Sequence, residues 1–178
     1  TKLTAMAGVR FDHSSLYGNF FTPRFHVKYS PVDAISIRLS AGKGYRMVFG
    51  LAEYNYLLAS GREFQITGDR LKQEEAWNYG MSTAFYIPMF GKTLKLNAEY
   101  YYTDFKNQAV VDYDANKGLI SIYNLIGKSY SHTFQIDASY PLLKGLEITA
   151  AYRLNDVKCT YDYGKTLKEK PLTSKYKA

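Results

Sequence analysis

Two short glycine-containing segments have residue types that could cradle a phosphate. Gly91-Lys92-Thr93 resembles the end of a phosphate-binding loop, in which a lysine and a hydroxyl follow a glycine. The upstream glycine that such a loop requires is replaced by Tyr86, so a tight hairpin turn explains the segment better. Gly42-Lys43-Gly44 lacks the third glycine of a dinucleotide-binding loop and does not lead into a predicted helix. We expect these glycines to relieve crowding inside a curving strand.

One acidic segment begins like a calcium-binding loop. Asp112, Asp114 and Asn116 have the required alternate spacing. Gly118, however, is one place late for the sharp turn, and Tyr123 stands where a bidentate glutamate is needed. This favours an ordinary turn-rich loop and leaves calcium binding at 112–118 as an open alternative.

Other catalytic and metal-binding patterns are lacking in the sequence. The three histidines are isolated, without metal-ligand spacing: His13, His26 and His132. No local Ser/His/Asp or paired-carboxylate arrangement supports catalysis. We therefore predict a protein that is not an enzyme and needs no metal or cofactor.

The segment Leu71–Asp114 predicts the kind of element that must position any functional residue. Apolar and polar residues alternate from Trp77 to Ile87 and from Leu94 to Thr103, on either side of a break at Pro88–Lys92. Such alternation is typical of strands with one apolar and one polar face. The same alternation recurs in the ranges 3–12, 24–29, 35–41, 134–140 and 146–155. The hairpin strands run about eleven residues, the length that crosses a bilayer, whereas soluble strands favour about five or six.

The reversals between strands are of two kinds. Short turns contain Pro31, Pro88 and Pro141, and longer connections lie between them. These long loops are predicted at 13–22, 45–70, 104–120 and 156–170, all at one end of the sheet, as in outer-membrane barrels. Pro171-Leu172-Thr173 is expected to open one more strand. The prediction is an all-β, antiparallel up-and-down transmembrane β-barrel, partial, with about seven or eight long meander strands, and with 1–178 as a segment of one barrel domain.

Composition is consistent with this prediction. The formal net charge is +7, but lysine and arginine are spread along the chain, which argues against a nucleic-acid partner. The 18 tyrosines have apolar bodies and polar tips, which suit a membrane–water interface. Cys159 is the single cysteine, so no internal disulfide is possible. Thr1–Thr4 begins inside an alternating pattern without signal-peptide features, so we expect a chain that is cut from a longer one.

Four segments carry a family resemblance: 23–31, 37–46, 71–80 and 101–107. They resemble the barrel of TonB-dependent outer-membrane receptors of the Bacteroidetes type, in a partial C-terminal barrel region. The Leu-Lys-x-Glu-x-x-Trp-Asn-x-Gly stretch at 71–80 is the most specific. The resemblance implies a plugged barrel of about 22 strands in the bacterial outer membrane that imports an iron chelate (a siderophore complex), cobalamin or a glycan. It also implies outer-membrane lipid, a plug domain and remaining barrel strands, TonB, and a small-molecule or glycan ligand as partners. The plug domain and the TonB-coupling segment have no counterpart in the chain.

The predicted long loop 45–70 combines aromatic and cationic side chains that suit ligand recognition. The candidate ligand contacts are Tyr45, Arg46, Tyr54, Tyr56 and Arg62, with the aromatic girdle of the barrel as the alternative location. Charges on the polar strand faces are expected to line the lumen as structural wall: Arg10, Arg24, Lys28, Arg38, Lys95, Glu99, Asp137, Glu147 and Arg153. Two alternatives remain: a soluble all-β ligand-binding domain and a small, complete eight-stranded outer-membrane structural barrel.

Overall fold

The computed structural model describes residues 2–67 and 70–178, in which long antiparallel strands form one sheet. Its long strands, in spatial order, are β1 (Leu3–Ser14), β2 (Gly18–Val32), β3 (Ile35–Arg46), β5 (Glu74–Met89), β6 (Lys92–Asn107), β9 (Ser129–Leu143) and β10 (Leu146–Tyr161). The short strands β11 (Thr166–Glu169) and β12 (Tyr176–Lys177) both pair with β10. The predicted meander of seven to eight strands is confirmed.

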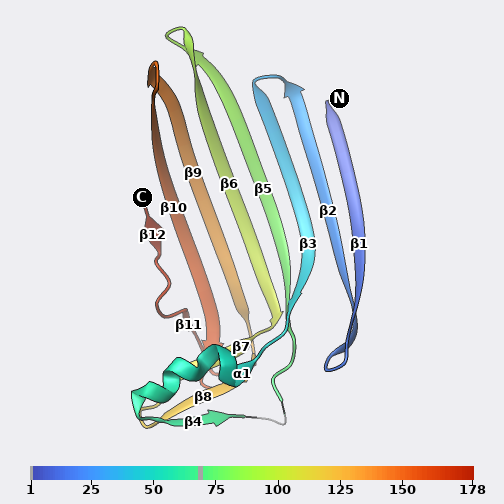
Figure 1. Cartoon of the computed structure of the whole chain (residues 1–178), viewed down its shortest axis with the longest axis vertical. Coiled ribbons are helices and arrows are strands. Elements are labelled where there is room, and N and C mark those ends of the chain that lie inside the picture. Colours follow the sequence, from blue (N-terminus) through green and yellow to red (C-terminus); the bar gives the residue numbers. More distant parts are fainter. Residues whose placement is uncertain (1, 68–69) are drawn as a thin grey trace.

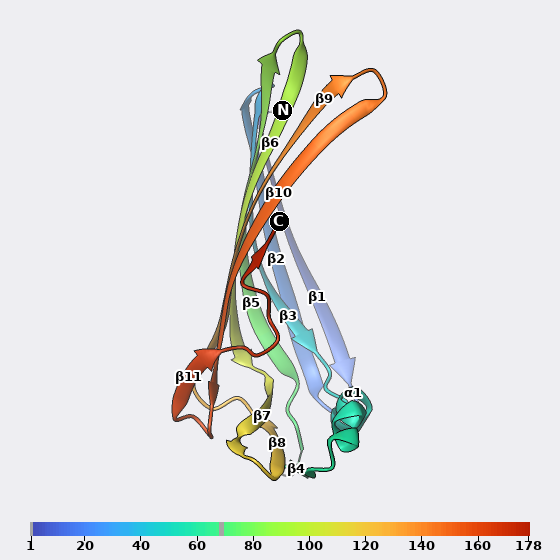
Figure 2. The ribbon, with the colours of Figure 1, turned by 90° about the vertical axis from the view of Figure 1, so that its left-hand side faces the viewer.

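The sheet is open, not closed. Within the described residues, β1 forms one edge and β11 with β12 the other, and these edges do not pair. Figure 1 shows the short turns at one end of the sheet and α1, β4, β7 and β8 at the opposite end. Figure 2 shows the sheet from its edge as a thin, bent layer, with the additional elements gathered at one end. We call the end that carries α1, β4, β7 and β8 the loop end.

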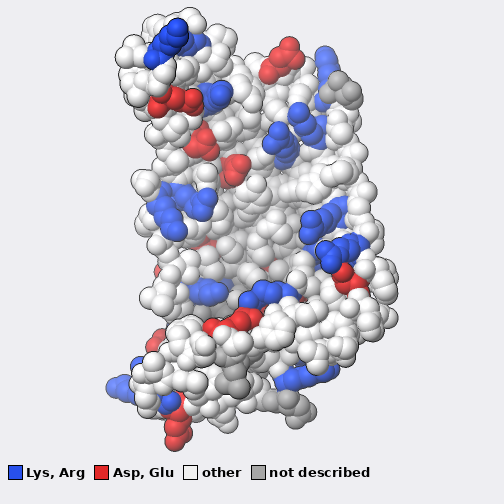
Figure 3. Space-filling model, in the orientation of Figure 1, with Lys and Arg blue, Asp and Glu red and all other residues white. Residues whose placement is uncertain are grey.

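Cross-strand register separates the residues into two faces. One row joins Val27, Leu39, Met81, Tyr100, Phe134 and Leu154 across six strands. The adjacent row joins Lys28, Arg38, Ser82, Glu99, Gln135 and Arg153. Because successive side chains point to opposite faces, one face is apolar and the other polar, as predicted. Figure 3 shows a charged face of the molecule that is hollowed along its middle.

The turn between β5 and β6, at the end of the sheet opposite the loop end, is tighter than the sequence predicted. Met89 pairs with Lys92, so the five-residue break at Pro88–Lys92 is a two-residue turn. Its residues Phe90 and Gly91 have φ values of 49° and 71°. Two consecutive residues at positive φ define a type I′ turn, whose twist matches that of the flanking strands. The hairpin turn that the sequence favoured over a phosphate-binding loop at Gly91–Thr93 is therefore confirmed.

Two predicted long loops are wrong. The range 13–22 is mostly strand, because Ser14 pairs with Gly18 across the turn at 15–17. The range 156–170 is also mostly strand, since β10 continues to Tyr161 and pairs with β11. Long and short connections therefore do not alternate strictly. Apolar alternation is absent from 13–22, and in β10 it changes phase after Leu154, since Val157, Cys159 and Tyr161 stand at odd positions. Periodicity therefore did not identify either strand extension. The predicted strand at Pro171–Thr173 is also wrong, since that segment separates β11 from β12.

The two other predicted loops contain further secondary structure. The range 45–70 holds α1 (Gly50–Tyr54), η1 (Asn55–Ser60) and β4 (Glu63–Ile66), while its residues 68 and 69 lie outside the described residues, as does Thr1. The range 104–120 contains all of β7 (Ala109–Asn116), which pairs with β8 (Leu119–Asn124). Strand β4 joins β8 in parallel, so both loops form one small sheet. Among the described residues, no helix combines the length and the apolar composition that crossing a membrane requires.

The buried residues lie mostly at the loop end and not on the long sheet. One cluster comprises Val48, Leu71, Ala109 and Ile122, and a second comprises Val110, Tyr123, Cys159 and Tyr161. On the sheet, large apolar side chains remain open, for example Val9 at 72% and Met81 at 47% exposure. The apolar face of the sheet thus needs an apolar environment outside the described residues.

We predict that a methyl group at Gly80 destabilises the sheet. A Cβ atom there would lie 2.6 Å from both Ser40 Oγ and the Tyr101 ring. Relieving that overlap should cost Gly80→Ala about 1–3 kcal/mol of unfolding free energy, measured by denaturant titration of the parent protein in detergent. Gly8→Ala is the matched control, because no atom lies within 4 Å of its added Cβ. Equal midpoints for the two variants would contradict the packing argument.

Candidate functional site

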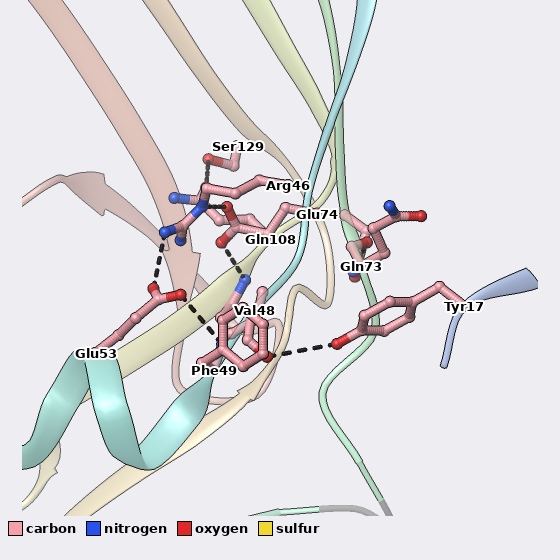
Figure 4. A network of polar contacts seen from close by, with 11 residues as sticks. Tyr17, Arg46, Val48, Phe49, Glu53, Gln73, Glu74, Gln108 and Ser129 are labelled. Carbon is pink, nitrogen blue, oxygen red and sulfur yellow. Dashed lines mark hydrogen bonds and ion pairs between the residues drawn. The ribbon is translucent and has the colours of Figure 1, made fainter. Parts of the chain in front are cut away.

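Arg46 is the centre of the polar network at the loop end. It was predicted in a loop with Tyr45, but both residues end strand β3, where Arg46 pairs with Glu74 of β5. Its Nε donates to Glu74 Oε2 at 2.6 Å, and its Nη1 donates to Glu53 Oε2 at 2.7 Å (Figure 4). Since Glu53 belongs to α1, the guanidinium connects this short helix to the main sheet.

The two carboxylates around Arg46 also bind backbone groups. Glu74 is buried, and its Oε1 accepts a hydrogen bond from Ala109 N of β7 at 3.0 Å. Glu53 Oε1 accepts from Phe49 N at 3.1 Å, which holds the start of α1. Charge-assisted hydrogen bonds of this kind are short and strong, so the network fixes α1, β3, β5 and β7 relative to one another.

A pocket of about 280 Å³ opens beside Arg46. Four phenol rings line it, each from a different element: Tyr54 (α1), Tyr56 (η1), Tyr113 (β7) and Tyr161 (β10). We call this the tyrosine pocket. Glu74, Gln108 and Lys170 also contribute to its wall.

Three of the five predicted ligand contacts meet in the tyrosine pocket: Arg46, Tyr54 and Tyr56. Arg62 is outside the pocket wall, where its Nη1 donates to Tyr113 O at 3.2 Å. Tyr45 lies elsewhere, under the Lys43 ammonium at 4.9 Å. Sequence reasoning missed Gln108, Tyr113, Tyr161 and Lys170, because they come from other loops and no local spacing links them to Arg46.

Two tyrosines of the pocket, Tyr54 and Tyr113, keep their protons. Burial, followed by the nearby Glu74 charge, raises the pKa of Tyr54. Burial and the neighbouring Tyr56 hydroxyl raise the pKa of Tyr113 to about 12. Both phenols are therefore neutral at physiological pH and can donate hydrogen bonds.

Asp112 holds together the elements beside the tyrosine pocket. Its Oδ1 accepts from Asp114 N and Ala115 N, each at 3.1 Å. Its Oδ2 accepts from Asp162 N at 2.7 Å and from the Tyr123 hydroxyl at 3.0 Å. Burial alone would raise the pKa of Asp112, but these four donors outweigh it and hold the pKa below its usual value.

These contacts give the calcium-like segment a structural role. The Asp112 carboxylate accepts hydrogen bonds from groups of the protein itself, and these bonds close a turn in the segment. In the part of the chain that the structure describes, no group of three or more His, Cys, Asp or Glu side chains is arranged for a metal. His13 contacts Asn19, and His132 stacks on Tyr102 with ring centroids 4.7 Å apart.

Aromatic residues form a band on the apolar face near the loop end. Tyr79, Tyr102 and His132 occupy one cross-strand row, and Trp77 stacks on Tyr79 with centroids 6.2 Å apart. Lysine–carboxylate pairs lie near this row: Lys43–Glu75 at 2.8 Å, Lys106–Asp104 at 2.6 Å and Lys158–Asp156 at 3.5 Å. Tyr45 pairs across strands with Glu75. Its location fits the aromatic girdle, the alternative that the sequence left open.

The nine charges predicted to line the lumen share the polar face by cross-strand register. Several of them bind neighbours on the wall itself. Arg153 Nε donates to Gln135 Oε1 at 2.8 Å, and Asn97 donates to Asp137 at 2.7 Å. These contacts fit the expected role as structural wall.

Comparison with known proteins supports this architecture. A family model described as "TonB dependent receptor-like, beta-barrel" matches residues 1–177. No curated protein matches the chain. A solved structure, the FrpB iron transporter from Neisseria meningitidis (F3-3 variant), is similar with a TM-score of 0.63 at 16% identity. The match covers 92% of this chain and 24% of that chain, so the present chain spans about a quarter of its length. At 16% identity, this similarity shows that the two chains share a fold.

We predict that Asp112 stabilises the loop end only while it is ionised. Because its pKa is lowered on folding, its contribution is complete above the unfolded value of about 3.9 and is lost as the pH falls through the folded value. Hydrogen exchange of the segments 109–124 and 159–165, corrected for intrinsic rates, should therefore accelerate in acid.

Substitution separates this effect from general acid unfolding. Asp112→Asn should exchange faster already at neutral pH, because an amide cannot accept all four hydrogen bonds. Asp114→Asn is the control, since the backbone of Asp114, and not its carboxylate, donates to Asp112. Identical exchange in the two variants would refute the role of Asp112.

Proposed function

The chain belongs to the TonB-dependent receptor β-barrel family, and from this premise we propose that it is part of the barrel wall of a receptor for active nutrient uptake across the bacterial outer membrane. The family is one of outer-membrane transport proteins, not enzymes. The plug domain, the remaining strands and the contact with TonB would be supplied by parts of a parent protein outside residues 1–178. The cargo would be an iron chelate, cobalamin or a glycan.

The apolar band on the sheet is the observation that carries this proposal. On β5 it extends from Tyr79 to Ile87, which is about 27 Å along the strand and, at a barrel tilt of roughly 40°, about 21 Å along the membrane normal. Outer-membrane barrels have an apolar band of roughly 25 Å between aromatic girdles. The aromatic row lies at one border of the band, as expected for a lipid–water boundary.

The two alternative functions fit these observations less well. A soluble all-β binding domain would bury its apolar face, but Met81 and Ile148 are 47% and 52% exposed. A small, complete structural barrel would pair its first strand with its last. Here β1 and the β11–β12 edge are separate within the residues described.

We assign ligand contact to the tyrosine pocket at the loop end. Arg46, Tyr54 and Tyr56 would contact the ligand, because they line a concave site with several hydrogen-bonding groups. Arg62 would not contact the ligand but would position Tyr113, to whose backbone oxygen it donates a hydrogen bond. Tyr45 would anchor the barrel in the lipid interface, with no ligand contact.

Paired labelling positions test the membrane assignment. In a cysteine-free parent receptor, nitroxides placed at Leu39 and Met81 should collide with dissolved oxygen, which concentrates in lipid. Nitroxides at the adjacent Ser40 and Ser82 should collide instead with a water-soluble nickel complex. The expected alternation follows from the opposite faces of neighbouring strand residues. Equal accessibility at all four positions would exclude a lipid-facing wall.

A further inference from the structure

The tyrosine pocket is electrically balanced, although it contains an arginine. The charged residues in its wall are Arg46, Glu74 and Lys170. Glu53 adds a second carboxylate at 2.7 Å from the Arg46 guanidinium. The site thus holds two cations and two carboxylates, both of them bound to Arg46, and its formal charge is zero.

An anionic ligand would compete poorly for Arg46. The guanidinium already binds Glu74 and Glu53 through Nε and Nη1. A negatively charged group would have to displace one carboxylate or approach both of them, and like charges close together cost free energy. The arginine therefore acts as an oriented hydrogen-bond donor and not as an unpaired anion receptor.

The rest of the wall suits rings that carry hydroxyl groups. Tyr54, Tyr56, Tyr113 and Tyr161 offer phenol faces, whose negative π-surfaces attract polarised C–H groups. The paired guanidinium and carboxylates, with the Gln108 amide, provide donors and acceptors side by side. Adjacent hydroxyls of a sugar are matched to such an array, since each can both donate and accept.

The size of the pocket favours a small ligand unit. Its volume is about 280 Å³, slightly below the roughly 300–1,000 Å³ of pockets that enclose drug-sized molecules. This space fits the end of a chain of small rings better than a large macrocyclic complex.

We propose that the tyrosine pocket binds the end of an uncharged saccharide, so that the cargo class of the receptor is a neutral glycan. This inference rests on the proposed uptake function and narrows its ligand. The phenol faces would stack on the sugar ring, while Arg46, Glu74 and Gln108 would bind its hydroxyls.

A printed array of neutral and acidic glycans tests the class with the full-length parent receptor in detergent. We expect retention on neutral glycans, with affinities that change less than about twofold between about 50 and 500 mM salt, because no net charge is involved. Tyr56→Ala should weaken that binding about tenfold, the loss typical of an aromatic contact residue. Leu58→Ala is the matched control: it lies on the same η1 turn and is 56% exposed against 60% for Tyr56, but it is not part of the pocket wall.

A charge substitution gives a second readout. Glu53→Gln keeps a side-chain oxygen that accepts from Phe49 N. It removes one of the two negative charges that are paired with Arg46. The variant should gain affinity for ferric citrate, an anionic probe, while neutral glycans remain bound within about threefold. Wild-type preference for acidic glycans or ferric citrate, or retention of no neutral glycan, would overturn the saccharide proposal. If the lipid–water labelling alternation persists in that case, the uptake proposal stands and only the ligand class falls.

Discussion

Cross-strand register is the constraint on which the other features of this sheet depend. A slip of one residue would move every apolar side chain of a strand to the opposite face. The register shifts at Tyr29/Val32, Glu75/Ala76 and Leu146/Glu147 all lie near strand ends. The middle of the sheet therefore keeps a continuous alternation, and the apolar band, the aromatic row and the polar wall remain at constant levels across neighbouring strands.

The hydrophobic core and the membrane face are separate parts of the molecule. Burial is concentrated at the loop end, where Ile120 and Ile122 are 1% and 0% exposed. Polar residues complete this region: Glu74 joins strand ends to β7, and Asp112 joins β7 to the turn after β10. A lipid-facing sheet presents apolar side chains outward, so the packing that fixes the tyrosine pocket has to come from the loops themselves.

Local periodicity predicted the long strands because each carries its own apolar alternation. It failed where the alternation stops, as in β3 before Arg46, or changes phase, as in β10 before Tyr161. There the pairing partners, not the residue pattern, decide the conformation. The pocket could be predicted only in part, since Arg46, Tyr54 and Tyr56 are close in sequence, whereas Tyr113 and Tyr161 approach them through pairings that no spacing reveals. Tyr45 is not part of the pocket wall, because it and Arg46 are successive residues of β3 and successive side chains of a strand point to opposite faces.

The parallel pairing of β4 with β8 has a consequence for the order of assembly. Glu63 lies opposite Leu119, and the intervening chain forms the complete β5–β6 hairpin and strand β7. Parallel strands need a long crossover, and contacts between distant residues slow folding. Strand β4 can find its partner only after the chain has crossed the sheet twice more. We therefore expect the segment that carries Tyr54 and Tyr56 to fold late. The tyrosine pocket then forms only after the strands that support it.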